Sequence, residues 1–453
     1  MRIAWYRLAA LVLFLWTVAS LTRTAPCAAA SAPHILLISV DTLRTDRMSS
    51  YGHWRSTTPK IDKLLALGAR FTEARTPAPL TAPAMSSVMT SLYPHEHGST
   101  RNGLRVRPNL VSFGRVLERR GYRTAGFVGN WTLKPELSGL AEHFGEYQAL
   151  LNRKRWFGLA KREATAEDIS AAALEWLGEA VSDGTDKPVF LWVHYVEPHA
   201  PYRLRRNYLR QIGVKAGTTF FSARNRYDSE IAYVDDQVGL FLERAGEMID
   251  LGNTLIVFLS DHGESLGEHA YWGHGRHLYD VTLRVPLGFV WPARIKAAVV
   301  AAPASILDVG PTVLSLAGLP VPAHFQGFDW SGVLEDGETA PMDRVTWHQA
   351  HRSSVQPNEE IEQLRQRGLL EVGKVANGRK EVIRVTNQRR RVFELDEDPR
   401  EKANLAAFGS VVSQDLSDWL EVVRAGLATA DDLPPPSLTD EDMEALRALG
   451  YID

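Results

Sequence analysis

Short apolar runs that end abruptly in polar residues recur along the chain. The run 254–259 stops just before Asp261 and His262, and the run 34–40 stops in the same way at Asp41. Both runs have the length and the continuous hydrophobicity of strands that are buried on both faces of a sheet. Because parallel sheets place their ligand sites at the carboxyl ends of the strands, the two runs predict a functional edge.

Segments with helical spacing of apolar residues separate these runs from others of the same kind. The alternation of strands and helices across 34–320 predicts a largely parallel sheet that helices cover on both faces. The expected strands are 121–128, 188–193 and 284–290, and the expected helices are 58–67, 165–179, 228–248 and 305–315. The acids of the long helix, Glu230, Asp235 and Asp236, are expected on a solvated face or as helix-cap partners.

The pattern changes after residue 322, where polar and apolar residues begin to alternate. Such alternation predicts a small antiparallel sheet with one solvated face. Its expected strands are 345–347, 369–373, 381–385 and 391–395, and helices at 411–427 and 440–449 follow, joined by a proline-rich linker. We therefore expect an α/β domain over 33–330 and an α+β part over 331–453. His348 and His351 have no motif context and are expected at the surface.

The N-terminal residues 1–30 indicate a secretory signal peptide. Arg2 and Arg7 precede a short apolar run, 8–18, and small residues follow it. Cleavage would give an exported protein, periplasmic or extracellular; the alternative is an uncleaved anchor, which is the only membrane contact we expect. The single cysteine, Cys27, lies in this segment, so the mature chain would have no disulfide, thiol nucleophile or thiolate metal site.

Composition narrows the classes of partner. The chain has 453 residues, of which 45% are hydrophobic and 23% charged, as in ordinary globular proteins. Its formal net charge of -3 argues against nucleic acid as the main partner. Function must therefore be argued from the residues at the strand ends.

A hydroxyl group joins the strand ends at Thr81. Pro83 suits the first turn of a helix and would disrupt its interior, so Thr81 falls at or just before a helix N-terminus. Free N–H groups and the helix dipole favour an oxyanion at such a position, although this segment alone is explained better by a plain N-cap. The strand 188–193 brings His194 and His199 to the same edge.

Two acids, one imidazole and one hydroxyl, from Asp41, Asp261, His262 and Thr81, make a plausible metal centre. A divalent ion there would lower the pKa of the Thr81 hydroxyl, and the ion and the helix dipole would stabilise an oxyanion transition state. Such a site suits displacement at phosphorus or sulfur. Zn²⁺, Mn²⁺, Mg²⁺ or Ca²⁺ could bind, and the imidazole of His262 favours Zn²⁺ or Mn²⁺.

The same residues lie in motifs that resemble those of the sulfatase family, within the alkaline phosphatase superfamily. The resemblance covers nearly all of the mature chain in family order. The matching segments are ISVDTLRTDRMSSYG, TPAPLTAPAMSSVMTSLYPHEHG, GYRTAGFVGNW, FLWVHYVEPHAPY, YDSEIAYVDDQVG, SDHGESLGEHAYWGHG, LRVPL and FELDEDPREKANL. The resemblance implies an alkaline phosphatase-like three-layer α/β sandwich with a large, mostly parallel sheet, plus a smaller C-terminal α+β part with an antiparallel sheet.

The departures from the family pattern concern the catalytic residue. Family sulfatases carry a C/S-x-P-x-R signature whose first residue becomes formylglycine, and its three fixed positions are Thr81, Pro83 and Met85 here. Threonine cannot become formylglycine, so we expect no formylglycine. The Lys-Trp-His segment of the family is replaced by Asn-Trp-Thr at 130–132. Two acids, a threonine and a histidine are retained around one metal site. This arrangement resembles the site of superfamily phosphotransferases, such as the phosphoethanolamine transferases, which act through a phosphothreonine.

The resemblance also implies which residues would meet the substrate. His199 and His274 are candidate catalytic residues that would contact the anion or the leaving group. The candidate substrate-binding residues are Asn102, Asn130 and Arg276, with Arg101 as an alternative source of positive charge. The other histidines of these motifs, at positions 95, 97, 269 and 277, are expected to shape loops.

Three functions follow from this set. The first is a metal-dependent hydrolase with Thr81 as metal-activated nucleophile, acting on an anionic ester: a sulfated or phosphorylated small molecule, glycan or lipid. The second is a phosphoryl transferase acting on envelope lipid or glycan, although such enzymes usually carry several membrane spans. The third is a non-catalytic sulfatase-like binding protein, against which the joint retention of the metal-site residues argues.

Overall fold

The computed structural model describes residues 32–155, 160–215, 217, 221–354, 368–408, 411–428, 439, 443 and 444. The predicted signal peptide, the proline-rich linker and most of the helix expected at 440–449 lie outside these residues. Residues His34–Asp453 form one compact unit, and the boundary expected near residue 330 stays a prediction. Among the helices of the described part, none is both long enough and apolar enough to cross a membrane.

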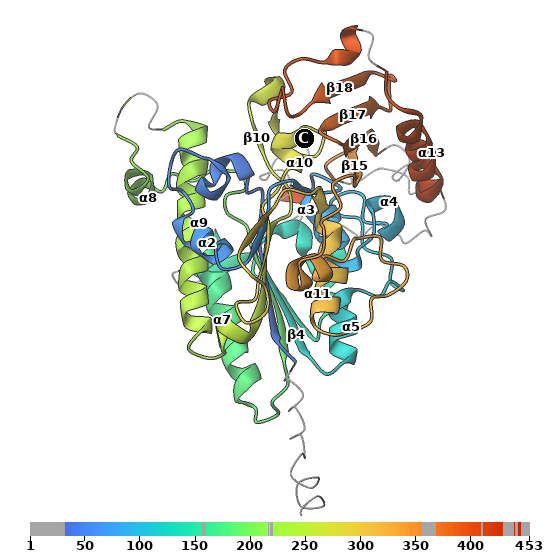
Figure 1. The fold of residues 1–453 in the computed structure, drawn as a ribbon. Coiled ribbons are helices and arrows are strands. Elements are labelled where there is room, and N and C mark those ends of the chain that lie inside the picture. Colours follow the sequence, from blue (N-terminus) through green and yellow to red (C-terminus); the bar gives the residue numbers. More distant parts are fainter. Residues whose placement is uncertain are drawn as a thin grey trace, which may run out of the picture. The chain divides into compact units, whose positions relative to one another are not determined.

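An eight-stranded sheet forms the centre of this unit, in the order β13-β2-β12-β9-β1-β8-β4-β5 (Figure 1). The neighbours β9, β1, β8, β4 and β5 all run parallel. β12 is antiparallel to β9 and to β2, so the sheet is mixed but mostly parallel, as expected. The bounds are β1 His34–Val40, β2 Ala69–Phe71, β4 Arg123–Val128, β5 Glu146–Ala149, β8 Val189–Tyr195, β9 Thr254–Ser260, β12 Leu287–Val290 and β13 Ala298–Val300.

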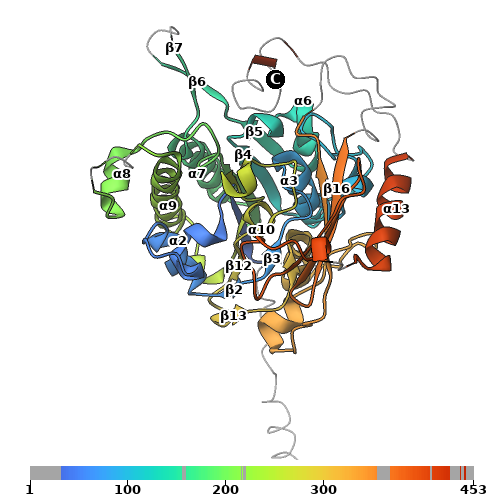
Figure 2. The ribbon, with the colours of Figure 1, turned by 90° about the horizontal axis from the view of Figure 1, so that it is seen from above.

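Helices cover both faces of the sheet and give the predicted three layers (Figure 1, Figure 2). On one face, α2, α7 and α9 bury residues such as Ile61 and Ile231 against the strands. On the other face, α3, α5 and α11 bury Val88 and Val313 in a second core. The bounds are α2 Pro59–Leu65, α3 Thr81–Thr90, α5 Phe113–Arg119, α7 Ala166–Ser182, α9 Ala223–Ala245 and α11 Val309–Leu316.

The C-terminal part contains the predicted antiparallel sheet, with strands β15 Thr346–His351, β16 Leu369–Ala376, β17 Arg379–Arg384 and β18 Arg390–Glu394 in that order. Helix α13, Gln414–Ala428, covers one face of it by packing Leu416 and Val423 against Val372 and Ile383. Shorter elements are β3 Ala74–Arg75, α4 Pro94–His97, α6 Pro135–Ser138, β6 Asn152–Arg155, β7 Ala160–Glu163, α8 Arg206–Gln211, β10 Ser265–Leu266, β11 Trp272–Gly273, α10 Asp280–Leu283 and β14 Ala304–Ser305.

Two expectations about helix α9 were wrong: the residue at which it begins and the exposure of Glu230. The long helix α9 begins before residue 228, because Ser222 caps it by accepting from the backbone N–H of Asn225. Its Glu230 is buried, not solvated. Asp235 is a cap partner as expected, since its carboxylate accepts from the backbone N–H groups of Lys60 and Ile61 at the start of α2.

His348 and His351 are also buried, contrary to the surface position expected for them. Nδ1 of His348, in β15, donates to the carbonyl oxygen of Thr76, the residue that follows β3, at 2.8 Å. The Nε2 of His351 lies 3.3 Å from Oε1 of Gln349. Strand β15 is therefore tied to the segment after β3 through the ring of His348.

Candidate active site

The carboxyl ends of β1 and β9 bring two acids side by side. Val40 and Ser260 are partners in the parallel ladder, so the next residues, Asp41 and Asp261, leave the sheet at the same level. The backbone N–H of Asp41 still donates to the carbonyl of Tyr195 at 2.9 Å, which ties the end of β1 to β8. The sequence prediction that these two strand ends meet at one edge is thus correct.

Asp41, Asp261 and His262 each present one ligand atom, and these atoms lie within 4.8 Å of one another. Each carboxylate uses one oxygen for the protein. Oδ1 of Asp261 accepts from the backbone N–H groups of Thr42 and His262, while Oδ2 of Asp41 accepts from Nδ2 of Asn130. The other two oxygens, Oδ1 of Asp41 and Oδ2 of Asp261, are buried and have no hydrogen-bond partner among the described residues.

A hydrogen bond also orients the ring of His262, so that one ring nitrogen faces the two acids. Its Nδ1 donates to the carbonyl of Gly263 at 2.9 Å, so the lone pair of Nε2 points toward the acids. Nε2 lies 3.3 Å from Oδ2 of Asp261 and 4.0 Å from Oδ1 of Asp41. Gly263 is required for this turn, because a Cβ there would lie 2.1 Å from the carbonyl oxygen of Val281.

Thr81 is the first residue of α3, as its spacing from Pro83 predicts. Its Oγ1 lies 3.3 Å from Nε2 of His262 and 3.5 Å from Nδ2 of Asn130, and the side chain is fully buried. The unpaired N–H groups and the dipole of the helix N-terminus favour negative charge at this oxygen. The alternative of a plain N-cap does not describe it, because Leu80 occupies the cap position.

These groups fit a divalent cation. Burial, together with the negative charge of Asp41 beside it, raises the pKa of Asp261 to about 7. Burial lowers the pKa of His262, which keeps its Nε2 lone pair available. Two carboxylate oxygens without partners, an imidazole nitrogen and a hydroxyl form a donor set suited to Zn²⁺ or Mn²⁺ and compatible with Ca²⁺ or Mg²⁺.

Two asparagine side chains lie beside the start of α3 with fixed amide orientations. Oδ1 of Asn130 accepts from the backbone N–H and the hydroxyl of Thr132, both at 2.8 Å, so its Nδ2 points to Asp41 and Thr81. Oδ1 of Asn102 accepts from the backbone N–H of Ala82 at 3.3 Å, next to Thr81. Nδ2 of Asn102 is buried and has no hydrogen-bond partner in the described structure.

His274 and His199 approach the same place from two loops. The His274 ring lies 4.4 Å from the ring of His262 and 5.1 Å from that of His199, measured between centroids. Nδ1 of His274 lies 3.1 Å from Oε1 of the buried Glu264. Although burial opposes it, the charge of His274 lowers the pKa of Glu264, so an acid–imidazole pair stands beside the candidate metal ligands.

The two candidate cations differ in their surroundings. Arg276 is exposed, and among the described residues no hydrogen bond or ion pair joins its side chain to Thr81 or to the acids. Arg101 is fully buried, and its guanidinium donates to the carbonyl of Ser354. A substrate contact by Arg276 or by Arg101 stays a prediction.

Sequence reasoning missed Glu264 and Thr132. Glu264 follows the Asp261–His262 pair in the same loop, and an acid ten positions before a histidine is too common a pattern to indicate a pair. Thr132 was noticed only as the position of a missing family histidine. Of the histidines expected to shape loops, His97 lies in α4, where its Nε2 bonds to Oγ of Ser87, and His269 stacks on Tyr279 with ring centroids 3.7 Å apart.

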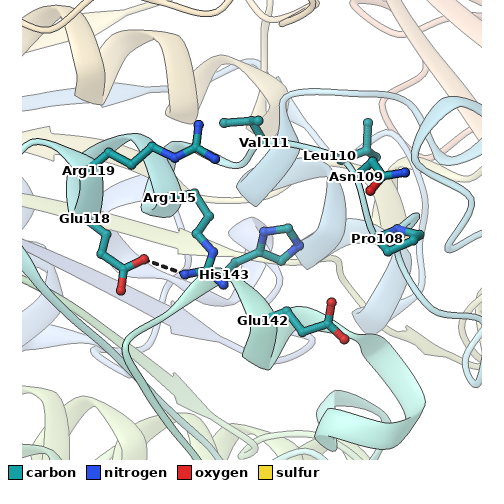
Figure 3. Close-up of a pocket in the computed structure, with 9 residues that line it drawn as sticks. All are labelled: Pro108, Asn109, Leu110, Val111, Arg115, Glu118, Arg119, Glu142 and His143. Atoms are coloured by element: carbon teal, nitrogen blue, oxygen red, sulfur yellow. Dashed lines mark hydrogen bonds and ion pairs between the residues drawn. The ribbon is translucent and has the colours of Figure 1, made fainter.

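A separate hollow of about 500 Å³ lies on the flank of the α/β part (Figure 3). Its lining residues come from α5 and from the segments before and after it: Pro108, Asn109, Leu110, Val111, Arg115, Glu118, Arg119, Glu142 and His143. Arg115 pairs with Glu118 at 2.6 Å within the same helix. None of the candidate metal ligands lines this hollow, so it is not the site formed at the sheet edge.

Fold and site together define a member of the sulfatase family, and the chain belongs to that family. The family profile "Sulfatase" matches residues 33–319, and the profile "N-sulphoglucosamine sulphohydrolase, C-terminal" matches residues 267–421. The predicted membership of the sulfatase family is therefore confirmed, and the chain belongs to a family of ester hydrolases.

Several proteins of known sequence or structure are similar to this chain. Bovine (Bos taurus) arylsulfatase A is 28% identical over 391 residues, which cover 75% of this chain and 75% of that protein. A structure solved in complex with its substrate D-glucosamine-2-N,6-O-disulfate has a TM-score of 0.69 at 21% identity and covers 90% of this chain and 100% of the other. The phosphonate monoester hydrolase of Agrobacterium radiobacter has a TM-score of 0.66 at 22% identity, with 93% and 96% covered.

Proposed function

We propose that the protein is a metal-dependent hydrolase of sulfate or phosphate esters in which Thr81 is the nucleophile. The observation that carries the proposal is the position of its Oγ1, which lies 3.3 Å from Nε2 of His262 at the N-terminus of α3. A divalent cation held by Asp41, Asp261 and His262 would lower the pKa of the hydroxyl and offset the charge that develops on the ester oxygens. No formylglycine is involved, since threonine has no route to it.

The reaction follows from the arrangement of the chain's own groups. Oγ1 of Thr81 gives up its proton to solvent and attacks the sulfur or phosphorus atom, while the bond from that atom to the alcohol oxygen breaks. Nδ2 of Asn130 and of Asn102 donate to the oxygens that gain charge. His274, held by Glu264, gives the departing alcohol a proton, and water then cleaves the ester formed on Thr81.

The substrate class is drawn from the relatives as well as from the site. Arylsulfatase A and the complex with a disulfated glucosamine support a sulfate ester, whereas the phosphonate monoester hydrolase supports an ester of phosphorus. The superfamily phosphotransferases that this chain resembles act through a phosphothreonine, so a threonine nucleophile favours an ester of phosphorus. We propose an anionic ester on a sugar, lipid or small molecule outside the cytoplasm, in agreement with the signal peptide expected at residues 1–30.

The experiment measures metal content and turnover of nitrophenyl sulfate, nitrophenyl phosphate and bis-nitrophenyl phosphate. Thr81→Ala is compared with Thr81→Ser, which keeps a hydroxyl, and with Thr90→Ala, a buried threonine at the other end of the same helix. The proposal expects activity to be lost only in Thr81→Ala, with metal retained. Equal turnover in Thr81→Ala would refute the nucleophile.

Two further outcomes of this experiment would favour a different function. Neither metal nor turnover in the wild-type protein would favour a binding protein with the sulfatase fold. Transfer of the phosphoryl group to an added alcohol in preference to water would favour a transferase.

A further inference from the structure

A line of three buried side chains runs under the candidate cation site and ends on Asp41. Trp192 and His194 lie on β8 and Ser39 lies on β1, where Ser39 and His194 are partners in the parallel ladder. Nε1 of Trp192 lies 2.8 Å from Oγ of Ser39, and the same Oγ lies 2.8 Å from Nδ1 of His194. Nε2 of His194 then lies 3.4 Å from Oδ2 of Asp41. All four side chains are fully buried.

The donor at the far end fixes the direction of these contacts. The indole N–H of Trp192 can only donate, so Oγ of Ser39 accepts from it and has one proton of its own to place. That proton has two possible acceptors: Nδ1 of His194 at 2.8 Å and the carbonyl of Val193 at 3.4 Å. The shorter contact is the better hydrogen bond. Nδ1 of His194 therefore accepts, and the ring carries its proton on Nε2.

This tautomer puts an N–H group on Nε2, the ring nitrogen that lies 3.4 Å from Oδ2 of Asp41. Within the described residues, Nε2 of His194 makes no hydrogen bond, and the carboxylate oxygen beside it is Oδ2 of Asp41, 3.4 Å away. The other tautomer would place a lone pair against that oxygen, and two lone pairs at this distance repel. Oδ2 of Asp41 thus faces two donors, His194 and Asn130, and its Oδ1 is the oxygen left over.

We propose that Trp192, Ser39 and His194 form a positioning relay that orients Asp41 as a cation ligand. The three residues would never touch the cation or the ester, and they would set the cation affinity by holding one carboxylate oxygen so that the other points into the site. This inference rests on the proposed cation site, which it deepens. Outer partners of this kind typically change metal affinity by about 10- to 100-fold.

The test measures cation affinity and not only activity. Mn²⁺ and Ca²⁺ are titrated separately by calorimetry into the full-length protein after treatment with a chelator. His194→Met removes the N–H donor with little loss of volume, and His194→Gln supplies an amide N–H in its place. His143→Met is the matched control, since His143 is a buried histidine in the flank hollow and not at the sheet edge.

The relay predicts that His194→Met weakens cation binding by about 10- to 100-fold, that His194→Gln recovers most of the affinity, and that His143→Met binds like the wild type. Ser39→Ala, which removes the hydroxyl alone, shifts the affinity in the same direction and carries the test if His194→Met does not fold. Ring ¹⁵N NMR of the cation-free protein is expected to show His194 protonated on Nε2.

The contrary outcomes are distinguishable. Wild-type affinity in both His194→Met and Ser39→Ala, or a His194 ring protonated on Nδ1, overturns the relay and leaves the proposed hydrolase standing. A wild-type protein that binds neither cation overturns the cation site itself and the relay with it.

Discussion

Oγ1 of Thr81 lies 3.3 Å from Nε2 of His262, although 181 positions separate the two residues in the chain. One residue begins a helix and the other follows a strand, and the sheet edge brings both into the space beside two buried acids. This contact joins the hydroxyl that we assign as nucleophile to the ligand atoms that would activate it.

Removal of the cation should destabilise the wild-type protein. A ligand that binds only the folded state stabilises it by about 2.7 kcal/mol at a concentration 100-fold above its Kd. We expect a chelator to lower the melting temperature of the wild type and to leave that of Asp261→Asn unchanged. Thermal denaturation with and without the chelator measures this, and an equal shift in both proteins would place the cation elsewhere.

The Glu264–His274 pair should matter most when the leaving group is poor. A nitrophenolate leaves without a proton, whereas an alkyl alcohol needs one, so only the latter reaction depends on an acid. We expect Glu264→Gln and His274→Asn to lower kcat/KM for alkyl esters by about 100-fold and for nitrophenyl esters much less. Equal losses for both kinds of ester would assign the pair a structural role.

Asn130 should affect turnover more than binding. Its Nδ2 is aimed at Asp41 and Thr81 because Thr132 holds the amide oxygen. Loss of one donor to a developing oxyanion typically costs about 100-fold or more in kcat. We therefore expect Asn130→Ala to lower kcat with little change in KM. A raised KM at unchanged kcat would mean that the amide binds the ground state of the ester.

Acid should destabilise the fold through three buried histidines. Burial lowers the pKa of His97, His348 and His351 to about 3 each, far below the value of 6.5 for an exposed histidine. Between these values the unfolded chain binds protons that the folded chain does not, so stability is full above pH 6.5 and falls as the pH drops toward 3.

Urea unfolding at pH 7.5, 5.5 and 4.5 measures this dependence. We expect the free energy of unfolding to decrease steadily with pH, and His348→Gln to decrease less than the wild type over the same interval. A wild-type protein that is equally stable at all three pH values would contradict the burial of neutral imidazoles.

Local pattern was enough to predict the strands that carry the site. The apolar runs before Asp41 and Asp261 have strand length, and parallel pairing forces their ends to one edge, so the acids were found without the structure. Thr81 was placed by Pro83, whose ring allows it only near the start of a helix. These predictions needed only residues close in sequence and the geometry of a parallel sheet.

Features that depend on distant partners could not be predicted. His348 looked exposed because nothing near it in the sequence shows that the carbonyl of Thr76 accepts from its ring. The orientation of the His262 ring depends on a carbonyl, and the Glu264–His274 pair depends on how one loop folds back. Arg276 lies in a site motif, and its exposure follows from the path of the loop and not from its neighbours in sequence.

The central claim is that the sulfuryl or phosphoryl group of the ester is transferred to Thr81 before water releases it. The most direct measurement is acid quenching of the enzyme during turnover of nitrophenyl sulfate and nitrophenyl phosphate, followed by mass spectrometry of the peptide that contains Thr81. We predict a sulfo or phospho adduct on Thr81 that is absent from Thr81→Ala. A wild-type enzyme that turns over in a burst without any adduct, or an adduct on another residue, would contradict the account.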